Sequence, residues 1–194
     1  MQSCLCQFQD ANSETEKRRI ADDMTTETEQ KEISDDSFLK GKQSHARKKL
    51  NVRMQLIALK LFRILIDAVP NASDVVSTSR IMLFFKYMKL NMNITIDESI
   101  SIVVLLQRFV SKQTEKSIQI LSSRNIGTML VVLAIVAIKA NRDYTYKNRH
   151  FAKEFGIPLA VLNESENAFM KIMDNTLFID ESEFSHLQNE IFKI

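Results

Sequence analysis

Residues 126–140 read IGTMLVVLAIVAIKA, and this stretch decides the fold class of the chain. Ten apolar residues follow one another from Met129 to Ile138, as in a helix that is buried on all sides at the centre of a domain. A transmembrane span would need about 20 apolar residues, roughly twice this run. A buried strand is the other alternative because several residues are β-branched, but the length of the run and the helical spacing around it favour a helix.

The chain before this stretch shows apolar residues at helical spacing. A first helix is expected to begin near Leu50 and to end at Pro70, followed by a polar connection over residues 71–79. Residues 80–90, which read RIMLFFKYMKL, indicate a short amphipathic helix.

Two further helices are expected, one before and one after the central helix. Thr95 or Asp97 can accept the free amide hydrogens at the start of the first, and Glu98 lies near its positive end. Pro158 is expected in the first turn of the second. We therefore predict an all-α domain of five or six helices without a sheet. One face of the last long helix is expected to consist of Leu162, Phe169, Met173 and Leu177.

The composition excludes several classes of protein. The 194 residues include only three glycines, each isolated, and this excludes the Gly-rich loops that bind nucleotide phosphates. Glycine and proline together are also too few for the turns of an all-β sandwich. Cys4 and Cys6 have no second pair that would complete a zinc site or a disulfide framework. The first residues, MQSCLCQFQ, lack the pattern of a secretory signal, so we expect an intracellular protein of the nucleus, the cytoplasm or both.

The N-terminal quarter of the chain differs in charge from the rest. Residues 10–36 contain ten acidic and four basic residues and almost nothing apolar, which is typical of a disordered segment. Six basic residues and no acidic one follow between Phe38 and Arg53. This basic stretch indicates a nuclear-import signal, a nucleic-acid contact or, more simply, a solvated linker before the first helix. We divide the chain into a disordered charged tail over residues 1–49 and a helical domain over residues 50–194.

A search for catalytic and metal-binding patterns identifies no candidate. His45, His150 and His186 are far apart in sequence and lack cysteine or acidic partners at metal-ligand spacing. We therefore expect no enzyme, and neither a cofactor nor a metal. One charged residue stands out, because Lys139 ends the apolar run of the central helix. It either extends its amine from the helix end into solvent or lies at the rim of an interface beside a carboxylate.

Residues 137–184 read AIKANRDYTYKNRHFAKEFGIPLAVLNESENAFMKIMDNTLFIDESEF. This segment resembles, without a gap, the cyclin box of the P/U-type cyclins, the group that includes the yeast phosphate-regulating cyclins. Upstream, LLQRFV at residues 105–110 resembles a family helix that reads YLDRL, and RIMLFFKYMK resembles the first family helix. The matching positions mix polar and apolar types and are Lys139, Asp143, Tyr146, Asn148, Ala152, Lys153, Gly156, Leu159, Leu162, Asn163, Glu166, Phe169, Asp174, Leu177 and Phe184.

The resemblance implies a five-helix cyclin-box bundle, with its core over residues 80–178 and an extra N-terminal helix. Members of the family have no catalytic activity and bind a cyclin-dependent protein kinase. They pack against the kinase helix that carries the glutamate partner of the ATP-site lysine. In cyclins generally, a lysine that ends the third helix and a glutamate on the fifth reach the kinase backbone, and Lys139 and Glu166 stand at these positions. The resemblance also implies Asp143, Phe169 and Arg108 as kinase-binding residues.

Three positions depart from the family pattern, and one of them is Phe155, which stands in place of one of two paired glycines. Gln107 replaces the aspartate of YLDRL, and Arg142 replaces an acidic residue that follows the central helix. The departures indicate a divergent member rather than another fold. The sequence thus predicts a cyclin, a regulatory subunit that binds and activates a cyclin-dependent kinase. The alternative is a cyclin-fold adaptor that binds nucleic acid or a transcription component through its basic stretch. We expect a kinase partner rather than nucleic acid, with no membrane contact and no small-molecule substrate.

Overall fold

The computed structural model describes residues 36–193 and the side chains of residues 48–193. These residues form helices and no β-strand, so the all-α prediction is confirmed and the strand alternative for the central segment is wrong. In chain order the helices are α2 (Asp36–Ala68), α3 (Ala72–Val75), α4 (Thr78–Met92), α5 (Ile96–Glu115), α6 (Ile126–Asn141), α7 (Asn148–Glu154), α8 (Leu159–Ile172) and α9 (Glu181–Phe192).

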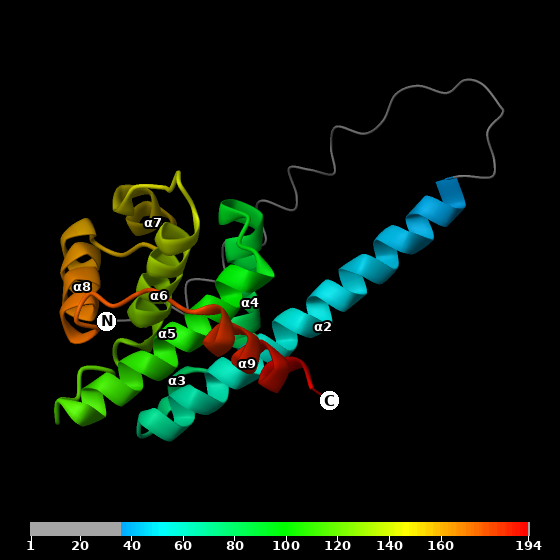
Figure 1. Ribbon diagram of the computed structural model, residues 1–194. Helices are drawn as coiled ribbons and strands as arrows, with labels where there is room; N and C mark the ends of the chain where they lie inside the picture. Colours follow the sequence, from blue (N-terminus) through cyan, green and yellow to red (C-terminus); the bar gives the residue numbers. More distant parts are fainter. Residues whose placement is uncertain (1–35, 194) are drawn as a thin grey trace.

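The central helix α6 forms the core of the bundle (Figure 1). Its residues from Met129 to Ile138 are all buried, as the continuous apolar run predicts. α5 and α8 both pack against α6. Phe109 of α5 also stacks on Phe169 of α8, with 5.1 Å between the ring centroids. This contact joins the two helices that flank α6 and gives the core a continuous apolar interior.

α5 begins at the residue that the sequence indicates. The Thr95 hydroxyl accepts a hydrogen bond from the backbone N–H of Glu98, and the Glu98 carboxylate accepts one from the backbone N–H of Thr95 at 2.8 Å. This reciprocal pair is a capping box, which satisfies two amide groups that would otherwise lack a partner. Of the two expected caps, Thr95 is therefore the one used. Asn93 precedes it in a left-handed conformation, with φ of 50°, and ends α4.

α2 packs on α4, α5 and α9 through a face whose first buried residue is Met54. Its N-terminal half extends beyond the other helices, as Figure 1 shows. The helix already begins at Asp36, before the expected start of order near Leu50. The disorder predicted for residues 1–35 lies outside the described residues, and the division of the chain at residue 49 stays a prediction.

The end of α8 differs from the sequence prediction. The helix ends at Ile172, and Asp174 and Asn175 then adopt left-handed backbone angles, with φ of 52° and 57°. Leu177 therefore lies beyond the helix rather than on its face, although it still packs against the core. At the other end, Pro158 is the N-cap residue and does not occupy the first turn.

Three of the helices have no counterpart in the sequence prediction. α3 and α7 contain four and seven residues, which is too short to show a helical period. α9 begins after Asp180, whose carboxylate accepts a hydrogen bond from the backbone N–H of Glu183. Leu187 and Ile191 are the buried residues of α9, and this helix contacts α2 and α5.

Candidate partner-binding site

Lys139 lies in the last turn of α6, where the helix leaves the core. Its amine donates a hydrogen bond to the carboxylate of Glu166 on α8, with 2.7 Å between Nζ and Oε1. The Lys139 side chain is 37% exposed and that of Glu166 is 16% exposed. A carboxylate therefore lies beside the amine, as the second interpretation of Lys139 expects, while the side chain is also partly exposed, as the first expects.

Asn148, at the start of α7, contacts both members of this pair. Its side-chain oxygen accepts a hydrogen bond from Lys139 at 2.9 Å, and its amide nitrogen donates to Glu166 at 2.6 Å. The same nitrogen donates to the side-chain oxygen of Asn163 on α8 at 2.9 Å. We call Lys139, Asn148, Asn163 and Glu166 the rim cluster. Because one amide group holds both charged groups, their orientation depends on the position of α7.

A groove of about 160 Å³ lies between the start of α6, α8 and the loop that joins α5 to α6. Asn163 and Glu166 of the rim cluster alternate along α8 with residues that line the groove. Because an α-helix turns by about 100° per residue, Val161, Ser165 and Ala168 lie on one flank of α8, and Asn163 and Glu166 lie on the opposite flank. The lining residues are mostly apolar or small: Ile120, Asn125, Thr128, Met129, Val161, Glu164, Ser165, Ala168 and Phe169.

Gln113 fixes the loop wall of this groove. Its side chain is buried, and its side-chain oxygen accepts hydrogen bonds from the backbone N–H groups of Ile120 and Leu121, both at 2.7 Å. Two amide groups of the loop are thus satisfied by one side chain of α5. Ile120 is thus held in place where it lines the groove, and its side chain stays 37% exposed.

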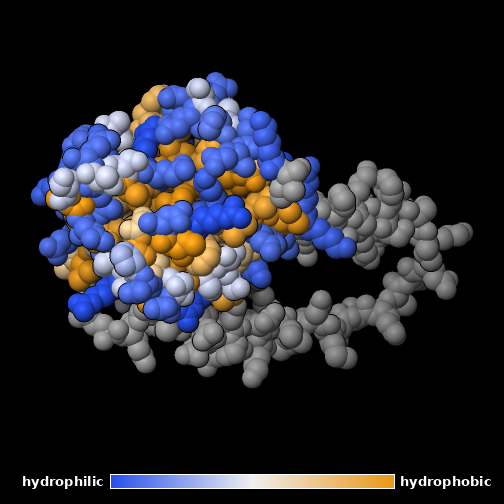
Figure 2. Space-filling view, turned by 90° about the horizontal axis from the view of Figure 1, so that it is seen from below, coloured by the Kyte–Doolittle hydropathy of each residue, from blue (hydrophilic) through white to orange (hydrophobic). Residues whose placement is uncertain are grey.

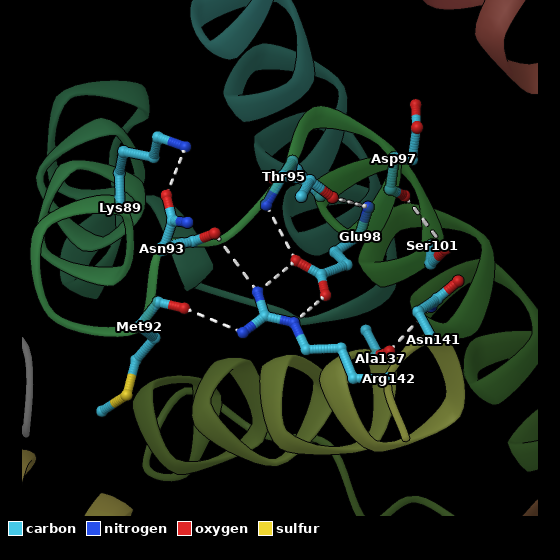
Figure 3. Close-up of polar contacts among 11 residues, drawn as sticks. Lys89, Met92, Asn93, Thr95, Asp97, Glu98, Ser101, Ala137, Asn141 and Arg142 are labelled. Carbon is cyan, nitrogen blue, oxygen red and sulfur yellow. Dashed lines mark hydrogen bonds and ion pairs between the residues drawn. The ribbon is translucent and has the colours of Figure 1, made fainter. Parts of the chain in front are cut away.

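A second charged cluster lies just beyond the end of α6 (Figure 3). Arg142 donates to both carboxylate oxygens of Glu98, from Nε at 2.5 Å and from Nη2 at 2.7 Å. Its two Nη atoms also donate to the backbone carbonyl groups of Met92 and Asn93, at 3.1 and 3.2 Å. We call Arg142, Glu98 and these carbonyl groups the buried cluster, because the Glu98 side chain is only 4% exposed. It ties the end of α6 to the turn between α4 and α5.

The environment of Glu98 keeps its carboxylate charged. Burial alone would raise the pKa of Glu98, because it disfavours the charged form. The hydrogen bonds from Arg142 and from Thr95 outweigh this effect and hold the pKa below its ordinary value. The hydrogen bond to Glu98 in turn raises the pKa of Arg142. The basic residue that departs from the family pattern therefore has its own acidic partner within the chain.

The structure places Phe169 and Asp143 differently, although both were predicted as kinase-binding residues. Phe169 is buried and stacks on Phe109, so it forms the floor of the groove and supports the lining from below. Asp143 is exposed in the turn after Arg142. Neither residue is part of the rim cluster.

Arg108, the remaining residue of the predicted set, binds within the chain. It donates from Nε to the carboxylate of Glu183 on α9 at 2.9 Å, and a second nitrogen contacts the other carboxylate oxygen. It also donates to the backbone carbonyl oxygen of Phe178 at 2.8 Å. In this structure Arg108 therefore connects α5 with α9 and with the segment before it.

The sequence reasoning missed two of the residues that build these clusters. Asn148 entered only as one matching position of the family pattern, without a role. Arg142 was noted only as a departure from the family pattern, and its partner Glu98 lies 44 residues away in sequence. No local signal relates two residues at such a separation.

The sequence pattern of the Cyclin family matches residues 4–177. This match covers most of the chain, so the chain belongs to the cyclin family, whose members are regulatory rather than catalytic. No curated protein and no solved structure matches the chain. In the described part of the chain, no helix combines the length and apolar character that crossing a bilayer requires, and no three His, Cys, Asp or Glu residues are grouped so as to hold a metal ion.

Proposed function

We propose that this cyclin is a P/U-type regulatory subunit that binds and activates a cyclin-dependent protein kinase through the rim cluster. The observation that carries the proposal is the contact between Lys139 and Glu166, which are 27 residues apart and come from different helices. The resemblance to the P/U-type cyclins selects these two positions without reference to their distance. It also includes Asn148 and Asn163, which complete the same cluster.

The charged groups of the rim cluster suit the backbone of a partner. The Lys139 amine has three donors, of which Asn148 and Glu166 accept two, so that a third can donate to a carbonyl group of the kinase. The Glu166 carboxylate has further lone pairs that can accept from kinase amide groups. Charge-assisted hydrogen bonds of this kind are worth about 1.5–3 kcal/mol each.

The groove, on the other flank of α8, would supply a separate apolar contact. Ile120 and Val161 line it, are 37% and 46% exposed, and can pack against a kinase helix. Binding that favours the active position of that helix shifts the kinase toward its active conformer. Phosphoryl transfer then belongs to the kinase, and the cyclin contributes position rather than a catalytic group.

The proposal is tested by co-expressing the full chain with a panel of cyclin-dependent kinases and purifying the complex. We expect Lys139→Ala with Glu166→Ala to remove the bound kinase while the helical circular dichroism signal stays unchanged. The matched control is Lys60→Ala with Glu190→Ala, which removes an ion pair of 2.5 Å between α2 and α9. Undiminished binding by the folded rim variant would overturn the residue assignment. A wild-type chain that binds no kinase of the panel would overturn the proposed function.

A second candidate function, an adaptor that binds nucleic acid, is favoured by one observation. The basic stretch of residues 38–53 forms the N-terminal half of α2, which projects from the bundle (Figure 1). Phosphate contacts would make the binding constant fall steeply with salt, with a logarithmic slope of about one per neutralised phosphate. Titration with duplex DNA and with RNA at low salt tests this, and no binding there would exclude the adaptor.

A further inference from the structure

The first half of α2 carries most of the excess positive charge of the described part of the chain. The basic stretch, residues 38–53, contains six basic residues and no acidic one, whereas residues 54–193 contain sixteen basic and fourteen acidic residues. Figure 2, which views the molecule from below, shows hydrophilic residues spread over the bundle between apolar ones. Six cations of the bundle contact a carboxylate: Lys60, Arg108, Lys112, Lys116, Lys139 and Arg142. Lys48 and Lys49 are exposed, and neither has an ion-pair partner among the described side chains.

The described side chains of the basic stretch also have little packing. All residues from 48 to 53 except Leu50 are exposed, and the buried face of α2 begins only at Met54. Lys49 and Arg53 are four residues apart, a spacing at which like charges destabilise a helix. A helix without tertiary packing is only marginally stable in water. A negatively charged segment alongside this part of α2 would relieve the repulsion and supply contacts.

The chain carries such a segment directly before α2. Residues 10–36, which we call the acidic segment, contain ten acidic and four basic residues and have a net charge of −6. The segment ends at Asp36, the first residue of α2, and is therefore tethered to the helix that it would contact. From Asp36 to Arg53 the helix rises by about 26 Å, a distance that about eight extended residues span. The acidic segment is thus long enough to return along the whole basic stretch.

α7 offers the alternative surface for an acidic segment. Lys147, Arg149 and Lys153 are exposed there, and none has an ion-pair partner among the described side chains. This surface has half as many cations as the basic stretch, and the acidic residues Asp143 and Glu154 flank it. It also lies much farther along the chain from the acidic segment, and the effective concentration of a tethered group falls as the connection lengthens. Both differences favour α2.

We propose that the acidic segment lies against the basic stretch of α2 and covers it. Exposed ion pairs hold the contact, so that salt weakens it. The covered stretch is the surface that the adaptor alternative assigns to nucleic acid, and any polyanion would have to displace the acidic segment to bind there. The rim cluster is built from α6, α7 and α8. The inference therefore does not rest on kinase binding.

The contact is tested on the full chain with nitroxide spin labels on Cys4 and Cys6, the only cysteines of the chain. In NMR spectra at low salt, we expect the labels to weaken the backbone amide signals of residues 48–53. The signals should recover in about 1 M salt, where charges are screened beyond about 3 Å. The amide signals of α7 are the control and should not change. No weakening at α2, or equal weakening at α2 and α7, would overturn the proposal.

The position of the contact is tested with two triple variants of the labelled chain that remove the same number of charges. The first variant removes three cations of the basic stretch: Arg47→Gln, Lys48→Gln and Lys49→Gln. It should restore the amide signals of residues 50–53. The matched variant removes the three cations of α7: Lys147→Gln, Arg149→Gln and Lys153→Gln. It should leave the signals of α2 weakened. The opposite result in chains that keep their helical circular dichroism would show that the acidic segment does not lie on α2.

Access to the basic stretch gives an independent test, with heparin as the polyanion probe. One variant of the full chain neutralises part of the acidic segment: Asp22→Asn, Asp23→Asn, Glu27→Gln and Glu29→Gln. We expect it to bind heparin about tenfold more tightly than the wild type, because several exposed ion pairs no longer compete with the probe. The matched control neutralises four exposed carboxylates of the bundle: Asp67→Asn, Asp74→Asn, Asp97→Asn and Glu181→Gln. Equal affinities of the two variants would overturn the proposal, because net charge alone would then explain the binding.

Discussion

Arg142 and Lys139 lie three residues apart at the C-terminal end of α6, and each binds a glutamate from another helix. In the buried cluster, the planar guanidinium of Arg142 donates hydrogen bonds to both carboxylate oxygens of Glu98 and to two backbone carbonyl groups. In the rim cluster, Lys139 offers a point charge with a donor to spare, and Glu166 keeps unused lone pairs. The charged groups of the buried cluster are therefore fully paired within the chain, whereas those of the rim cluster keep a donor and lone pairs that are not used within it.

This difference separates a pair that is closed within the chain from a pair that a partner can reach. The Glu98 side chain is 4% exposed and that of Glu166 is 16% exposed, so a partner can reach only the second carboxylate without unfolding the chain. Breaking a buried pair leaves a charge without a partner in a low dielectric, whereas breaking a pair at the surface lets water replace the lost contact. Neighbouring ion pairs of the same chemical type therefore differ in how much their loss is expected to destabilise the fold.

The largest effect on folding stability is expected for Arg142→Ala. The substitution leaves the Glu98 carboxylate buried and unpaired, which lowers the free energy of unfolding by about 3 kcal/mol. Lys139→Ala in the rim cluster should lower it by less than about 1 kcal/mol. Urea denaturation followed by circular dichroism measures both. Equal losses for the two variants would contradict the division into a buried and a rim cluster.

The second effect concerns the pH dependence of stability. The pKa of Glu98 in the folded protein lies below its ordinary value of 4.5, so its contribution is fully present above that value and is lost as the pH falls through the folded pKa. The urea midpoint of the wild type should therefore fall on acidification more steeply than that of Glu98→Gln. The two proteins should become similar in stability at the acidic end. Parallel profiles would show that Glu98 is not held charged by Arg142.

The smallest effect on stability, and an intermediate effect on binding, is expected for Asn148→Ala. The Lys139–Glu166 pair remains, but it loses the amide group that orients both members. Once the kinase is identified, calorimetric titration should show weaker binding than for the wild type and stronger binding than for the double alanine variant of the rim cluster. Asn163→Ala, which removes only a neighbour of Asn148, is the control. Equal losses for the two single variants would show that Asn148 does not orient the pair.

The sequence predicts those parts of the fold that depend on local patterns. The apolar run of α6 needs no knowledge of its neighbours, and the capping box at Thr95 is complete within four residues. α7 was missed because its seven residues bury only Phe151 and Ala152, which define no period. The sequence of α9 does contain helix signals, namely Asp180 as a capping residue, an acidic first turn and apolar residues four apart. They were missed because the family pattern ends near the start of this helix.

The candidate site divides in the same way. Lys139 and Glu166 were singled out only because the family resemblance marks both positions, and their contact with each other was not predicted. The pairing of Arg142 with Glu98 was not foreseen, because it depends on how the turn after α4 meets the end of α6. The internal contacts of Arg108 arise in the same way, since α9 brings Glu183 to a side chain 75 residues earlier. Tertiary packing decides these roles.

The burial of α6 has a consequence for how such a protein can diverge. Ten consecutive residues, Met129 to Ile138, are enclosed on every side, and large-to-small changes in such positions cost about 1–5 kcal/mol each. Substitutions at these positions are selected against because they destabilise the fold, whatever their effect on partner binding. Within α6, a change of partner preference is therefore expected only in the last turn and in the turn that follows it. The central helix can vary only at the few residues where it meets the solvent.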